Sequence, residues 1–210
     1  MQRFASARGR AQLFDVLVAA QLALSGLELV AWLVAALSGN GNLIHVLNRG
    51  RTTIGAFEAV LFVFATVVLA AWAFRVLANL PALGVARRRL DPDSALVLIL
   101  VPIVNFVAAP LVARAVWLDT DPTPPARGRV RNVLIAWYGG FALSLAAVAE
   151  LRGAVGRGLA LVEMLGEAGW LLAGAACLVA VRAVQRRQDE QWNDGELKRA
   201  VPQPAADGLR

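Results

Sequence analysis

Five hydrophobic blocks of about twenty residues each dominate this sequence of 210 residues. A helix of that length crosses the hydrocarbon core of a membrane, which is about 30 Å thick. Because backbone polar groups in lipid must be bonded within the protein, each crossing block is expected to be an α-helix. The pattern predicts an all-α, polytopic integral membrane helical bundle. The blocks are residues 13–37, 54–76, 94–117, 132–149 and 159–181.

The third block is interrupted by Pro102 and Pro110, each of which removes an amide donor and disturbs the preceding helical turn. The distribution of positive charge indicates whether this block crosses the membrane. If it enters and leaves on one side, only four of the 21 Lys and Arg residues lie outside, whereas a crossing would place more than half outside. These four are Arg49, Arg51, Arg152 and Arg157. We therefore predict four transmembrane helices, one re-entrant or interfacial helical segment, and both termini in the cytoplasm.

A single membrane domain is predicted over residues 1–192. The basic residues before the first block resemble a secretory signal, but this block is too long for one and contains Asp15 and Glu28. We therefore interpret it as a retained first span. The last helix is expected to continue to about residue 192, and the tail at 193–210, rich in proline, glycine and charge, is predicted to be disordered and cytoplasmic.

Aromatic, polar and proline residues occur at a distinctive spacing in the second, third and fourth blocks. They are Trp72, Arg75, Asn79 and Gly84, then Pro102, Asn105, Pro110 and Trp117, and finally Trp137. Their order resembles a bacterial, mainly actinobacterial, family of multi-span membrane proteins that is catalogued only as a domain of unknown function. The resemblance covers residues 57–191 and implies a membrane protein, but it supplies no activity.

Four glutamates are predicted to lie within the membrane, where an unpaired charge costs about 2.5–3.5 kcal/mol or more. Glu28 falls near the middle of the first span, and Glu58 near the outer end of the second. Glu163 and Glu167 are one helical turn apart in the last span, close to small residues that permit tight helix contact. All four are expected in the outer half of the membrane, with no basic residue at the same depth.

These acids have two interpretations. They could line an externally open cavity that binds a cation or relays protons. Alternatively, each could be protonated, bonded to a neighbouring helix, or directed toward the head groups beside the outer arginines, which is the commoner situation. The two interpretations differ in geometry, because only the first requires the carboxyl groups to converge on a water-accessible space.

Two polar residues near the broken block are assigned structural roles. Arg75 is expected to cap backbone carbonyls freed by the break at Pro102, in preference to binding an anionic lipid or ligand. Asn105 is interpreted as a hydrogen-bonding support for the same backbone.

The sequence offers no recognisable catalytic set, and we predict no enzyme activity and no cofactor. His45 is the only histidine and is expected in an outer loop, and Cys177 lies in a hydrophobic block, so no transition-metal site is predicted. Ser25, Ser94 and Ser144 have no candidate base.

The leading functional hypothesis is a structural or interaction component of an assembly in the bacterial plasma membrane. The alternative is a small transporter or channel subunit that binds a cation or proton through the outer-half carboxylates. The expected partners are anionic lipid head groups, and either another membrane protein or further copies of this chain. Nucleic acid is not expected as a partner, because the basic residues flank hydrophobic blocks and form no stripe with interleaved aromatics.

Overall fold

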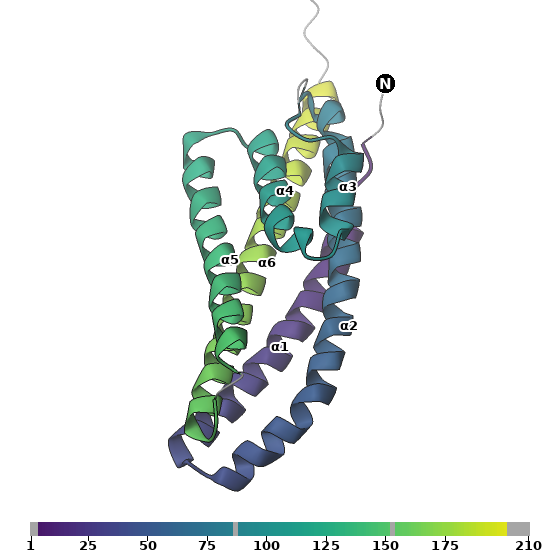
Figure 1. Ribbon diagram of the computed structural model, residues 1–210. Coiled ribbons are helices and arrows are strands. Elements are labelled where there is room, and N and C mark those ends of the chain that lie inside the picture. The colour runs from purple at the N-terminus through teal and green to yellow at the C-terminus, as the bar shows by residue number, and fades with distance from the viewer. Residues whose placement is uncertain (1–3, 86–87, 152–153, 201–210) are drawn as a thin grey trace, which may run out of the picture.

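The computed structural model describes residues 4–85, 88–151 and 154–200, and within them the chain is almost entirely helical. These residues contain no β-strand. The all-α bundle predicted from the sequence is therefore confirmed (Figure 1). The elements are α1 (Arg8–Ser38), α2 (Gly41–Asn79), the 3-10 helix η1 (Leu80–Leu83), α3 (Pro92–Leu100), α4 (Val104–Thr120), α5 (Pro124–Glu150) and α6 (Arg157–Ala200).

Four of the described helices are long and apolar enough to cross a membrane: α1, α2 together with η1, α5 and α6. Their outward faces carry large hydrophobic side chains, including Leu27 at 70% exposure, Phe57 at 61% and Ile135 at 65%. A soluble protein rarely exposes so much contiguous apolar surface, whereas lipid contact accounts for it.

The proline-interrupted block forms a helical hairpin. Its two helices, α3 and α4, are shorter than the four spans. The start of α3 and the end of α4 lie at the end of the bundle where α1 begins and α6 ends (Figure 1). Pro102 lies in the turn between them, and exposed Ile103 adopts a left-handed backbone with φ of 69°. The hairpin thus enters the bundle and returns to the same end.

α2 begins well before the hydrophobic block from which it was predicted. The segment that was expected to be an outer loop, including His45, Arg49 and Arg51, is helical, and only Gly39 and Asn40 separate α1 from α2. The prediction of a loop is wrong because hydropathy indicates which residues contact lipid, and a polar segment can still be helical. Here the Asn40 side chain accepts hydrogen bonds from two backbone N–H groups of the first turn.

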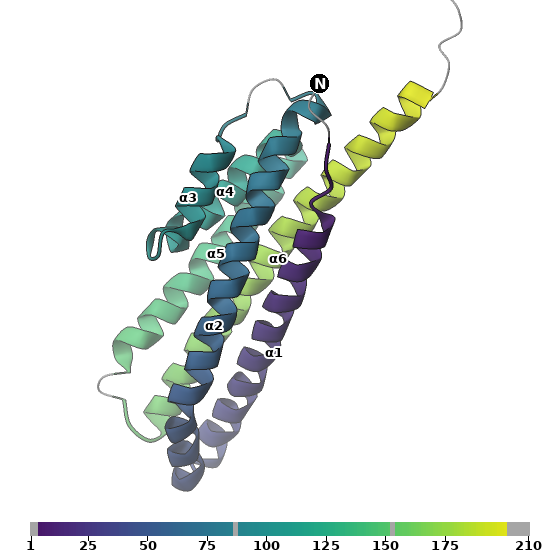
Figure 2. The same cartoon turned by 90° about the vertical axis from the view of Figure 1, so that its right-hand side faces the viewer.

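The amphipathic start of α2 also packs well. Ile44 is buried against Trp32 and Ala35 of α1 and Ala160 of α6. The end of α1, the start of α2 and the start of α6 therefore share a small apolar core at this end of the bundle. Figure 2 shows α1 and α2 running side by side from this end.

At its other end, α6 continues beyond the predicted boundary near residue 192 to Ala200. Ion pairs one turn apart, from Arg186 and Arg187 to Glu190, support the helix after it leaves the apolar stretch. Residues 193–200, predicted to belong to a disordered tail, are therefore helical, and the rest of that predicted tail, 201–210, lies outside the described residues.

The closest helix contact joins α5 and α6 through glycines. A Cβ atom built on Gly140 would lie 2.5 Å from the Gly169 carbonyl oxygen and 2.7 Å from the Ala173 nitrogen. Ser144 donates a hydrogen bond of 2.9 Å to the Gly166 carbonyl in the same interface. Small residues let the two backbones approach until polar contacts form between them.

Substituting Gly140 with alanine should therefore destabilise the bundle by about 1–3 kcal/mol, because the new methyl group meets backbone atoms that cannot move aside. The neighbouring Gly139→Ala is a matched control, since Gly139 has open space around it. Thermal unfolding of the detergent-solubilised proteins should give a lower midpoint for Gly140→Ala alone. Equal midpoints would contradict the close packing of α5 on α6.

Candidate functional site

The residues that resemble the family motif lie mainly around the end of the bundle that carries the termini. The Trp72 indole Nε1 donates to Gln185 Oε1 of α6 at 3.2 Å, and both residues are buried. Asn79 at the end of α2 receives a hydrogen bond from the Ala5 N–H and donates one to the Ala5 carbonyl. Gly84, with φ of 85°, ends η1. These contacts fasten α2 to α6 and to the N-terminal segment.

Most of the remaining motif residues are also packed into the bundle, whereas Pro102 in the hairpin turn is exposed. Pro110, Trp117 and Trp137 are buried. Asn105 is buried at the start of α4, and its side-chain Oδ1 has no hydrogen-bond partner. Arg75 Nε is likewise buried without a partner, so capping of the broken segment by this atom is not observed.

A cavity of about 580 Å³ lies toward the end where α1 meets α2 and α5 meets α6. We call it the acidic cavity. α1, α2, α5 and α6 supply most of its wall, and Phe106 in the first turn of α4 contributes at the hairpin tip. Because the hairpin stops part-way along the bundle, α2 and α5 face each other across this space. All four predicted intramembrane acids line it: Glu28, Glu58, Glu163 and Glu167.

Three of these acids form one cluster. One carboxylate oxygen from each of Glu28, Glu58 and Glu167 lies within 4.8 Å of the others, although the residues come from α1, α2 and α6. All three side chains are half-buried. Ser25, one turn before Glu28, donates a hydrogen bond of 2.9 Å to Glu58 Oε1. The hydroxyl therefore fixes the orientation of one carboxylate toward the other two.

The serine contact corrects one expectation. Ser25 was expected to have no base nearby, but the Glu58 carboxylate of the neighbouring helix accepts a hydrogen bond from its hydroxyl. Ser25 itself is almost completely buried, at 1% exposure. Its observed role is to position Glu58.

The fourth acid, Glu163, is paired with a base. Arg51 Nε lies 2.8 Å from Glu163 Oε1, and Arg51 lines the same cavity. The expectation that no basic residue lies at the depth of the acids is therefore wrong. It failed because residues 41–53 were assigned to a loop, whereas the helical α2 places Arg51 two turns from Glu58 on one face. That spacing is the sequence signal that could have revealed the pair.

A cluster of aromatic rings closes the end of the acidic cavity that points toward the middle of the bundle. Phe62 stacks on Phe106 at a centroid distance of 5.5 Å and on Trp170 at 5.6 Å. Phe141 contacts Phe106 at 5.2 Å and Trp170 at 5.6 Å. Four helices thus contribute to one ring cluster, and such contacts stabilise by about 0.5–1.5 kcal/mol each beyond the area they bury.

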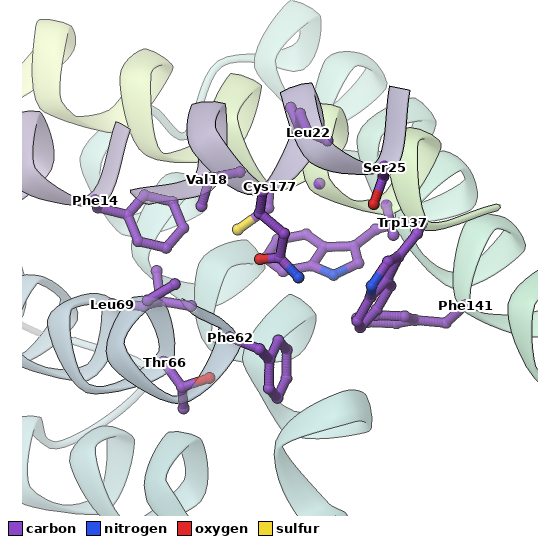
Figure 3. A pocket seen from close by; sticks show the side chains of 15 residues that line it. Phe14, Val18, Leu22, Ser25, Phe62, Thr66, Leu69, Trp137, Phe141 and Cys177 are labelled. Carbon is purple, nitrogen blue, oxygen red and sulfur yellow. The ribbon is translucent and has the colours of Figure 1, made fainter. Parts of the chain in front are cut away.

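A second, smaller cavity of about 70 Å³ lies beyond these rings (Figure 3). Its walls are mainly apolar, with Ser25 and Phe141 at one end and Phe14 and Leu69 at the other. Phe141 and Trp170 line both cavities. The aromatic cluster therefore separates the carboxylates from the apolar interior.

The chemistry of the acidic cavity is that of an oxygen-ligand site. Carboxylates and a hydroxyl are the groups that hard cations prefer, and they can hold water in the remaining space. Among the described residues, Glu28, Glu58 and Glu167 are the only group of three or more side chains placed to ligate one metal ion. Cys177 lines the apolar cavity, and His45 is exposed near the start of α2.

The fold and this cavity define a helical membrane protein with four apolar spans and a polar site enclosed between them. A family model matches residues 44–191, and the chain belongs to that family, described as the domain of unknown function DUF4328. The match runs from the first turn of α2 to Gln191 of α6 and so contains most of the residues that line both cavities. No curated protein and no solved structure matches the chain.

Removing the cationic partner should expose the cost of burying Glu163, whose side chain is only 10% exposed. We expect Arg51→Met to destabilise the protein by about 1–3 kcal/mol, since Arg51 is itself partly solvated. Combining it with Glu163→Gln should restore part of the loss. Exposed Arg49→Met, two residues away in sequence, is the control. A double-mutant cycle on thermal unfolding measures the coupling, and additive effects would show that the pair contributes nothing.

Proposed function

We propose that this protein binds a cation in the acidic cavity and serves as a small transporter or channel subunit. The observation that supports the proposal is the convergence of Glu28, Glu58 and Glu167 beside a space large enough for the ion and its water. Separate, locally bonded acids were the expectation for a purely structural protein. The scaffold hypothesis does not require this convergence.

Electrostatic repulsion favours an occupant. Two unit charges about 5 Å apart repel by about 3 kcal/mol at an effective dielectric constant near 20. Three such pairs meet in the cluster, and Arg51 is already engaged by Glu163. A bound cation attracts each carboxylate and so offsets their mutual repulsion. Protonation of the carboxylates is the competing way to remove the negative charge.

The position of the cavity suggests how the ion enters. If both termini are cytoplasmic, the acidic cavity faces the outer side of the plasma membrane. The aromatic cluster of Phe62, Phe106, Phe141 and Trp170 then closes the route inward. We propose that this conformation receives a cation from outside and that passage requires the rings to separate.

Cation binding should be measurable on the purified protein. We expect one or more of Ca²⁺, Mg²⁺, Mn²⁺, Na⁺ and K⁺ to raise the unfolding midpoint in a saturable way, because the ligand binds only the folded state. The effect should weaken as the pH is lowered, since protons compete for the same carboxylates. A triple variant, Glu28→Gln, Glu58→Gln and Glu167→Gln, should lose the effect.

Glu150→Gln is the matched control for these variants, because Glu150 is an exposed acid at the end of α5 and does not line the acidic cavity. It should bind the cation like the native protein. A native protein indifferent to all five ions, or a triple variant that still responds, would contradict the proposal. Co-purification of a stoichiometric membrane partner would then favour the scaffold hypothesis.

The membrane orientation has its own test. We expect green fluorescent protein fused to either terminus to fluoresce and alkaline phosphatase at the same places to be inactive, because these termini are proposed to be cytoplasmic. Phosphatase fused after Asn40, between α1 and α2, should be active. An active phosphatase at the C-terminus would reverse the assignment and place the acidic cavity on the inner side.

A further inference from the structure

A groove of about 720 Å³ runs between α4 and α5 at the end of the bundle that carries the termini. We call it the arginine groove. Side chains of four arginines reach it: Arg89 from the segment before α3, Arg114 from α4, and Arg127 and Arg131 from α5. The groove is separate from the acidic cavity and shares no lining residue with it.

Three of the four arginines have no anionic partner among the described residues. Arg89 is neutralised by Asp119, which accepts from Arg89 Nε at 2.9 Å and from its backbone N–H at 2.7 Å. Arg114, Arg127 and Arg131 are exposed, and no acid in the described part of the chain forms an ion pair with them. These three arginines therefore give the groove a positive charge that no described acid neutralises.

The rest of the groove is apolar and follows from helical spacing. On α5, Arg127 and Arg131 are followed on the same face by Leu134 and Tyr138. The face from Arg127 to Tyr138 extends about 16 Å along the helix axis. Leu118 of α4 completes the wall. Arginine side chains thus lie at one end of a groove whose remaining wall is largely apolar.

We propose that the arginine groove is a binding site for an anionic phospholipid. The head-group phosphate would lie among Arg114, Arg127 and Arg131, where guanidinium groups offer several N–H donors to its oxygens. One acyl chain would lie along the apolar wall. Charge complementarity alone would also suit a soluble phosphate or an acidic peptide, but neither uses the hydrophobic length of the groove.

Lipid selectivity provides the test. The purified protein is titrated in neutral detergent with phosphatidylglycerol, phosphatidylcholine, or inorganic phosphate, and binding is followed by native mass spectrometry and by the unfolding midpoint. We expect phosphatidylglycerol to bind at least tenfold more tightly than phosphatidylcholine. Equal affinity for the two lipids overturns the proposal. Inorganic phosphate that reproduces the whole effect overturns the lipid assignment and leaves an anion site.

Charge-matched variants locate the site. The triple variant Arg114→Gln, Arg127→Gln and Arg131→Gln should lose the tenfold preference. A control with the same loss of charge at the same end of the bundle, Arg10→Gln, Arg186→Gln and Arg187→Gln, should keep it, since these residues lie outside the groove. An equal loss in both variants would show general attraction to the protein surface and no site. Arg114→Gln alone, expected to weaken binding several-fold, replaces the triple variant if that protein does not fold.

Discussion

The arrangement of this protein depends on one requirement of the bilayer, that polar groups within it find partners inside the protein. The backbone satisfies the requirement as helix, and the spans then differ in how they satisfy their charged side chains. Asp15 of α1 pairs with Arg182 of α6, and Glu163 of α6 with Arg51 of α2. Each of these pairs joins two helices, so charge neutralisation also links α1 to α6 and α6 to α2.

The short α3–α4 hairpin divides the interior into two regions with different chemistry. Beside the hairpin, Trp72 donates to Gln185 of α6, and Asn79 and Gln188 donate to backbone carbonyls, which ties these elements together. Beyond its tip, acids of three helices line a cavity. A structural irregularity in the sequence, the break at Pro102, thus creates the polar site.

Much of this fold could be predicted from hydrophobic length and proline position, because both act within a single segment. The inward direction of Glu28 and Glu167 also followed from the cost of exposing them to lipid. Their convergence with Glu58 did not, because it depends on how α1, α2 and α6 pack, which no single segment encodes. The polar first half of α2 was missed for a different reason. Its helix is supported by the Asn40 cap and by contacts with Trp32, neither of which a hydropathy pattern measures.

The interlocked glycines of α5 and α6 have a mechanical consequence. With Gly140 and Gly169 in backbone contact, neither helix can slide or rotate on the other without breaking that contact. We therefore expect α5 and α6 to move together as a rigid pair, and Glu167 of α6 to move with them. Any change in the spacing of the three carboxylates is then left to α1 and α2, whose backbones are joined by the two residues Gly39 and Asn40.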